Sequence, residues 1–248
     1  DTMQVLLTNG DSWTQGDSPA QTLNWEAKKN LDWYDIIPNF GNLYKYVDEN
    51  GNPIVGDNTR ILYKFYDSPV WPKKLGEYIG CETWNAGRLG DDNYSITQST
   101  IQSCQWLINQ GKKPDYVIIG WTSMLRLPIY VTENNDLTVQ QQRPDKYTLA
   151  NELYTKLNYI QNEFLFHIFN LQNYFKTNNI DYLFFNAFDK FEDFDQHYMS
   201  KFIDKTKWID NDPKKAHFKE YICTKHGLDD WDESEYFRTS HPTDISHI

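Results

Sequence analysis

A serine stands where a buried strand is expected to end. Residues 5–7 (Val-Leu-Leu) form a short apolar run, and Asn-Gly-Asp at residues 9–11 interrupts it directly before Ser12. Open α/β sheets bind ligands in the crevice outside the carboxyl ends of their strands, so Ser12 can be exposed there without opening the core. Near a helix N-terminus, backbone N–H groups favour developing negative charge. The pattern fits a nucleophile, and it also fits a serine that caps a helix.

Other loops carry the groups that a nucleophilic serine needs. Ser12 requires a neighbouring base, and His241, close to the end of the chain, has the usual residue type. Gly90 and Thr122 each follow another predicted strand, so the loops meet at one sheet edge if the strands are parallel neighbours. Backbone N–H groups of Ser12 and Gly90 would then stabilise an oxyanion.

Hydrophobic periodicity predicts the elements that must position these loops. Residues 115–121 give the strongest strand signal in the chain, and a helix closed by Gly111 precedes them. Strand, helix and strand in succession predict a parallel sheet with right-handed crossovers. The expected strands are residues 5–7, 81–85, 115–121 and 179–188, and the expected helices are residues 71–80, 94–110 and 149–177.

Two segments are expected to lie outside this frame. Residues 41–68 predict a hairpin with a long turn, inserted beside the site. Residues 128–147 are polar and predict a loop that would let Arg126 and Arg143 fold over the site. Since no linker-like tract divides the 248 residues, we expect one domain, residues 1–248, built as a three-layer α/β/α sandwich around a central parallel sheet.

Four short blocks resemble, in order, those of the SGNH (GDSL-type) hydrolases, which are three-layer α/β/α esterases, lipases and carbohydrate deacetylases. The blocks are residues 9–12 (NGDS), 85–93 (NAGRLGDDN), 115–122 (DYVIIGWT) and 241–242 (HP). Trp121-Thr122 followed by Arg126 looks most like the divergent SGNH-like proteins of tailed bacteriophages. The resemblance implies a flavodoxin-like sheet and a site made of the nucleophile Ser12, the base His241, the oxyanion donors Gly90 and Thr122, and the supporting residues Asp11, Asn93 and Arg126.

Two positions depart from the pattern of that family. Thr122 stands where the family usually has an asparagine that donates to the oxyanion, and losing one such donor typically costs about 100- to 1,000-fold in rate. Arg238 stands where the family has the aspartate that orients the histidine. Unless Asp244, Asp230 or Asp232 substitutes for it, the site is a Ser–His dyad.

Composition bounds the partners and cofactors. A formal charge of −11 argues against nucleic acid, because phosphate binding needs clustered Lys and Arg. Cys223 and His226 are spaced as half a zinc site without a second matching pair, and no nucleotide-binding glycine motif is present, so no metal or cofactor is expected. No segment has the pattern of a transmembrane helix or signal peptide. We therefore expect no membrane partner, and a place in the host cytoplasm or on a virion.

Two classes of function agree with the sequence. The first is a serine ester hydrolase or deacylase acting on an acylated carbohydrate, or an acyltransferase that uses the same acyl-enzyme. The second is a non-catalytic glycan- or protein-binding module, such as a phage accessory or structural protein with a virion partner, in which Thr122 and Arg238 mark lost catalysis. The nine Trp and seventeen Tyr suit a glycan-facing or a protein-facing surface equally well.

Overall fold

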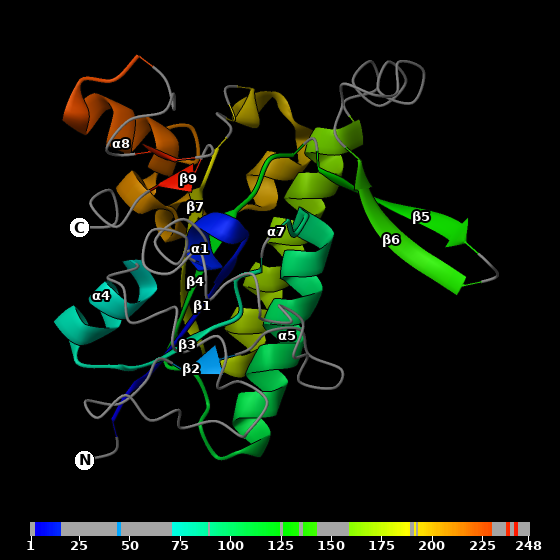
Figure 1. Ribbon diagram of the computed structural model, residues 1–248. Helices are drawn as coiled ribbons and strands as arrows, with labels where there is room; N and C mark the ends of the chain where they lie inside the picture. Colours follow the sequence, from blue (N-terminus) through cyan, green and yellow to red (C-terminus); the bar gives the residue numbers. More distant parts are fainter. Residues whose placement is uncertain are drawn as a thin grey trace.

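The computed structural model describes residues 3–15, 44–45, 71–88, 90–124, 126–133, 136–142, 159–188, 191, 193–229, 237–238 and 241–242 (Figure 1). Within this part of the chain, a five-stranded sheet has the order β2-β3-β1-β4-β7. Its parallel strands are β1 (Val5–Gly10), β3 (Glu82–Asn85), β4 (Tyr116–Trp121) and β7 (Asp181–Asn186). β2 (Tyr44–Lys45) pairs antiparallel with β3 at the edge.

The strand order creates a switch point between β1 and β4. From β1 the chain moves outward to β3, then crosses back over β1 to β4 and continues to β7. Open α/β sheets bind ligands at such a point, outside the carboxyl ends of the strands. The loops that begin with Asp11, after β1, and with Thr122, after β4, flank it.

Helices cover both faces of the sheet (Figure 1). α5 (Asn93–Asn109) and α7 (Tyr159–Asn178) pack together on one face, whereas α4 (Trp71–Ile79) and α8 (Phe218–His226) lie on the other. The short α1 (Ser12–Gln15) continues directly from the end of β1. These layers confirm the α/β/α sandwich with a central parallel sheet. None of the helices in the described ranges is long and apolar enough to cross a membrane.

Most of the core lies between the sheet and the pair α5 and α7. Trp121, at the end of β4, is fully buried, and its ring packs against Phe164 of α7 and Phe184 of β7, with centroids 5.4 and 5.5 Å away. Aromatic pairs at such distances add stability beyond the area they bury. The strand that ends beside the switch point is therefore firmly held from one side.

Local signals in the sequence account for the helix boundaries. α4 has Pro72 in its first turn, and Gly80 ends it with a φ of 71°, a conformation that glycine adopts without strain. α5 begins after Asp92, whose carboxylate accepts the backbone N–H of Ser95 at 2.8 Å. The predicted helices at 71–80 and 94–110 are confirmed to within a residue.

The prediction of a polar loop at residues 128–147 is wrong. β5 (Leu127–Glu133) and β6 (Asp136–Gln142) form an antiparallel hairpin in which Glu133 pairs with Asp136, and it projects from the body of the molecule in Figure 1. Apolar residues alternate with others along both strands, and Asn134-Asn135 separates them, which is the pattern of a two-residue hairpin loop. Abundant polar residues obscured this period-two signal.

Two further predictions can be compared with the structure only in part. The described helix α7 covers residues 159–178, and residues 149–158 of the predicted helix lie outside the described ranges. Within the predicted hairpin at 41–68, only Tyr44–Lys45 is described, as strand β2. Arg143 also falls outside the part of the chain that the structure describes.

Four short 3-10 helices follow β7 and lead towards α8. They are η3 (Phe194–Gln196), η4 (Tyr198–Phe202), η5 (Lys205–Lys207) and η6 (Ile209–Asn211).

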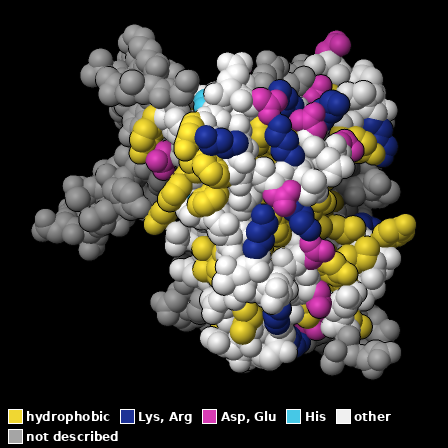
Figure 2. Space-filling view, turned by 180° about the vertical axis from the view of Figure 1, so that it is seen from behind, with side chains coloured by type: hydrophobic (Ala, Val, Ile, Leu, Met, Phe, Trp, Pro, Cys, Tyr) yellow, Lys and Arg dark blue, Asp and Glu magenta, His cyan; other side chains and the backbone are white. Residues whose placement is uncertain are grey.

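Basic and acidic side chains are interspersed on the face shown in Figure 2. Lys207 pairs with Asp181 at 2.5 Å, and Lys214 pairs with Asp195 at 2.5 Å. This face presents charges of both signs rather than a basic patch.

Candidate functional site

Asp11 is the centre of the hydrogen-bond network at the switch point. Its side chain is fully buried, and Oδ1 accepts the backbone N–H of Trp13 at 3.0 Å. Oδ2 accepts the hydroxyl of Thr122 at 2.8 Å and Nη1 of Arg126 at 3.1 Å. A buried carboxylate is tolerated when it is paired and hydrogen-bonded in this way. Asp11 thus ties the loop after β1 to the loop after β4.

Asn93 fixes the second of these loops from the start of α5. The side-chain amide of Asn93 donates to the backbone carbonyls of Thr122 at 3.3 Å and Ser123 at 3.4 Å. In return, the backbone N–H of Thr122 donates to Asn93 Oδ1 at 3.1 Å. Both the backbone N–H and the hydroxyl of Thr122 therefore have acceptors within the protein, where the family resemblance implied a donor to an oxyanion.

The guanidinium of Arg126 forms an ion pair with the carboxylate of Asp11. Its side chain is 28% exposed, and its guanidinium lies 5.2 Å from the ring centre of Phe188, in the range of a cation–π contact. Nη1 also donates to the backbone carbonyl of Asp91 at 3.4 Å. The guanidinium has five N–H donors in a rigid fork, which suits planar recognition of an oxyanion or carboxylate.

Asp91 is a second buried acid at the switch point, next to Arg126. The sequence analysis did not identify it as a site residue. Burial raises its pKa from 3.8 to about 8, and the charges of Asp92 and Asp11 push it in the same direction against the lowering effects of Arg88 and Arg126. The side chain of Asp91 is largely protonated at neutral pH under these influences. Perturbed acids of this kind cluster at functional sites, although structural networks also produce them.

Ser12 lies at the first position of α1 and is only 1% exposed. The next residue, Trp13, anchors this short helix, since its buried ring packs against Phe188 at 4.5 Å and Phe218 at 6.0 Å. Asn85, at the end of β3, donates to the backbone carbonyl of Thr14 at 2.9 Å. Ser12 is thereby held at the switch point from two sides.

Gly90 occupies the loop between β3 and α5, with a φ of 80° that favours glycine. The turn around it is closed by the backbone N–H of Asp91, which donates to the carbonyl of Arg88 at 3.2 Å. Arg88 in turn donates its backbone N–H to the carbonyl of Gly10 at 3.0 Å, so this loop is hydrogen-bonded to the loop that carries Ser12.

Two segments far apart in the sequence, α1 and β9, also meet here. His241 belongs to β9 (His241–Pro242), which lies next to α1. β9 pairs antiparallel with β8 (Phe237–Arg238), and Arg238 is the direct partner of His241 in that register. The structure therefore brings the backbone of His241 close to the helix that begins at Ser12. The candidate third members Asp230, Asp232 and Asp244 lie outside the described residues.

Cys223 and His226 lie on α8, and Cys223 belongs to the same buried apolar cluster as Trp13. Over the ranges that the structure describes, no three His, Cys, Asp or Glu side chains gather as a metal site would require. The chemistry available at the switch point is that of a serine, a guanidinium, the buried carboxyls of Asp11, Asp91 and Asp92, and backbone N–H groups.

A comparison with known families supplies a relationship but no activity. The model of a family of unknown function, DUF6071, matches residues 55–216, which is well over half of the chain. The chain belongs to the DUF6071 family. The DUF6071 match includes Asp91, Asn93, Thr122 and Arg126, whereas Ser12 and His241 lie on either side of it. No curated protein matches the sequence.

Proposed function

We propose that this DUF6071 protein is an SGNH-type serine ester hydrolase or deacylase with an acylated carbohydrate as substrate. The observation that carries the proposal is the position of β9, which holds His241, beside α1, which begins at Ser12 at the switch point of the sheet. A serine, a histidine and a glycine loop from three distant parts of one chain thus belong to one region of the fold. The choice of an acylated sugar rests on the resemblance to carbohydrate deacetylases. The resemblance of the sequence blocks to phage proteins extends the proposal to a protein that acts in an infected host cell or on a virion.

The proposed reaction needs no cofactor. Ser12 Oγ attacks the acyl carbon while its proton passes to His241, and the resulting oxyanion is bound by the backbone N–H groups of Ser12 and Gly90. His241 then gives the proton to the leaving alcohol. Water attacks the acyl-enzyme by the same route, releasing the acid and restoring Ser12. With an alcohol in place of water, the same steps give an acyltransferase.

Arg126 takes the role that asparagine has in the third block of the resembling family. The Thr122 hydroxyl already donates to Asp11, whereas the partly exposed guanidinium of Arg126 has donors beyond the Nη1 contact described above. In this proposal Arg126 steadies the oxyanion or an anionic group of the sugar. Asp11 holds Arg126 in place, and Thr122 donates to the same carboxylate oxygen.

A specific observation favours a second function. Arg238 is the direct strand partner of His241, at the position where an orienting carboxylate would be needed. A cation cannot stabilise a protonated histidine. The alternative is therefore a glycan- or protein-binding module that keeps the scaffold without the catalysis.

Covalent labelling separates these two functions. Ser12 is 1% exposed, so the probe is a compact fluorophosphonate, and the adduct is located by intact mass and peptide mapping. We expect stoichiometric labelling that is lost in Ser12→Ala and His241→Ala but kept in Ser123→Ala, which changes a serine in the neighbouring loop. Folded wild-type protein that takes up no label would overturn the hydrolase proposal, and glycan binding would then be measured.

A further inference from the structure

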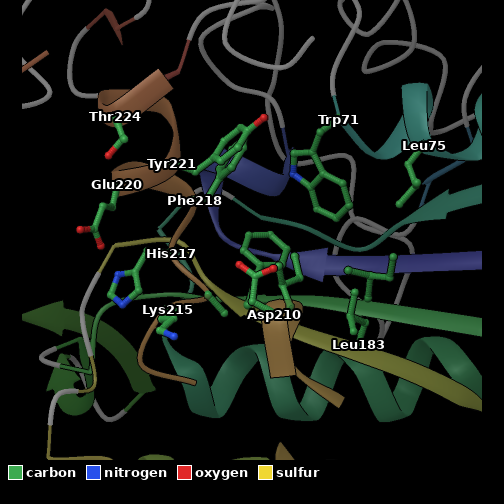
Figure 3. Close-up of a pocket in the computed structure, with 14 residues that line it drawn as sticks. Trp71, Leu75, Leu183, Asp210, Lys215, His217, Phe218, Glu220, Tyr221 and Thr224 are labelled. Carbon is green, nitrogen blue, oxygen red and sulfur yellow. The ribbon is translucent and has the colours of Figure 1, made fainter. Parts of the chain in front are cut away.

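A cavity of about 600 Å³ lies on the sheet face opposite α5 and α7, between α4 and α8 (Figure 3). Its walls come from both strands and helices and are mostly apolar, with Ile118 and Leu183 on the sheet, Trp71 and Leu75 on α4, and Phe218 and Tyr221 on α8. Small-molecule sites in proteins typically measure about 300–1,000 Å³ and have predominantly apolar walls. The cavity meets both descriptions.

Within the part of the chain that the structure describes, helices cover the sheet incompletely at this place. Val117 and Ile119 of β4 point to the side of α5 and α7 and are fully buried. Ile118, between them, faces the cavity and is only half-buried, and so is Leu183 of β7. Central strands of parallel sheets are usually buried on both faces, because helices cover each side. An apolar ligand would complete the missing layer.

Most of the labelled polar residues of the cavity lie towards one end, whereas Asp210 lies nearer the middle. Figure 3 shows His217, Lys215 and Glu220 together on the side away from Leu75, whereas Trp71 and Leu75 lie at the opposite end. The cavity is thus amphipathic along its length. A ligand that fits it has a hydrocarbon body and one polar head.

The charges at the polar end favour a neutral head. Lys215 is the lysine in the lining, and its Nζ lies 3.8 Å from Asp212, while Glu220 has interactions of its own within the protein. The charged groups at this end therefore have partners within the protein, which favours a neutral head over an ionised one. The imidazole of His217 is a group that can exchange a hydrogen bond with an alcohol or an amide.

We propose that this cavity binds a small neutral amphiphile, with its hydrocarbon part between Trp71 and the sheet and a hydroxyl or amide head near His217. The site is separate from Ser12. The Phe218 ring stands between the two regions, 6.0 Å from the Trp13 ring and 5.9 Å from the Phe185 ring that lines the cavity. The proposal therefore does not depend on the hydrolase activity.

The test is a fluorescence titration of the full chain with N-phenyl-1-naphthylamine, a neutral apolar probe. We expect saturable binding of one probe per chain, and displacement by 1-octanol at lower concentration than by octanoate. Leu183→Trp and Leu75→Trp fill the cavity and should each weaken binding by at least about tenfold. Ile79→Trp, on α4 but outside the lining, is the matched control, and Ser12→Ala should bind as the wild type does.

Each other outcome contradicts a stated part of the proposal. Non-saturable fluorescence, or equal affinity in the wild type and both cavity-filling variants, would overturn the site. Loss of binding in Ser12→Ala would move the probe to the switch point instead. Displacement by octanoate as readily as by octanol would refute the neutral head. If Leu183→Trp loses its native circular dichroism, Leu75→Trp on the helix surface still carries the comparison.

Discussion

The buried acid Asp91 makes the stability of the protein depend on pH. Its pKa is raised from 3.8 to about 8 in the folded state, so folding favours the protonated form. The stabilisation is full below pH 3.8 and is lost as the pH rises through 8. Asp91→Asn, which mimics the protonated acid, should therefore gain stability relative to the wild type between pH 5 and pH 9.

The expected gain is at least about 2 kcal/mol, since each unit of pKa shift corresponds to about 1.4 kcal/mol. Urea unfolding of both proteins at the two pH values measures it. Asp229→Asn, at an exposed position on the surface, is the control and should keep a constant difference from the wild type. A constant difference for Asp91→Asn as well would show that Asp91 does not titrate in this way.

Thr122 and Arg126 should act on stability as a coupled pair, because both donate to the same oxygen of Asp11. Thr122→Val and Arg126→Ala each leave this buried carboxylate with fewer donors, at an expected cost of about 1–3 kcal/mol. The loss of unfolding free energy in the double variant should differ from the sum of the losses in the two single variants by at least about 0.5 kcal/mol. Additive costs in a double-mutant cycle at pH 7 would mean that Asp11 does not join the two side chains.

The sequence could supply the residues of this site but not their pairing. Ser12, Gly90 and Thr122 follow three strand signals, so their meeting at one sheet edge follows from the parallel topology. The contact between Asp11 and Arg126 joins residues on different loops and depends on side-chain directions that no local pattern encodes. The same holds for the burial that raises the pKa of Asp91.

At the scale of elements, the close approach of β1, α1 and β4 depends on Gly10. A Cβ atom at this position would lie 2.3 Å from Thr14 Oγ1 and 2.7 Å from the backbone carbonyl of Gly120. Gly10→Ala should therefore push α1 away from β4 and cost about 1–3 kcal/mol. Thermal unfolding followed by circular dichroism measures this loss.

Two variants make the Gly10 experiment specific. Gly111→Ala adds a Cβ where no other atom lies within 4 Å, so its cost should come from the positive φ of 73° alone, about 1 kcal/mol. Adding Thr14→Ala to Gly10→Ala removes the closer of the two contacts and should recover part of the loss. If Gly10→Ala unfolds no earlier than Gly111→Ala, the packing of α1 on β4 is looser than described.

Periodicity predicted the elements of the sandwich because their signals are local. The apolar run of β4 and the caps of α4 and α5 need no tertiary context. The sequence analysis predicts a loop where the hairpin β5–β6 lies, because the polar residues of both strands hide the alternation of their apolar residues. For such segments, the period of two is more informative than the mean hydropathy.

The fold brings α1 and β9 together from distant parts of the sequence, and the described elements leave one sheet face partly open. Neither property is local. The proximity of β9 to α1 was expected only because a family resemblance supplied a partner for Ser12. The cavity between α4 and α8 depends on what fails to cover Ile118 and Leu183, and a sequence pattern cannot reveal an incomplete layer.

The arrangement of strands also predicts how stability is distributed over the molecule. β1 and β4 are paired on both sides within the sheet, whereas β5 and β6 pair only with each other among the described strands. Amides paired deep in a sheet open only with global unfolding, and an isolated two-stranded hairpin is marginally stable. Hydrogen exchange read by mass spectrometry should show the slowest exchange in peptides from β1 and β4, and much faster exchange in the hairpin. Equal protection of the hairpin would mean that it packs on the body of the protein. Slow exchange in β1 and β4 would mean that Asp11 and Thr122 directly follow the most stable strands of the described sheet.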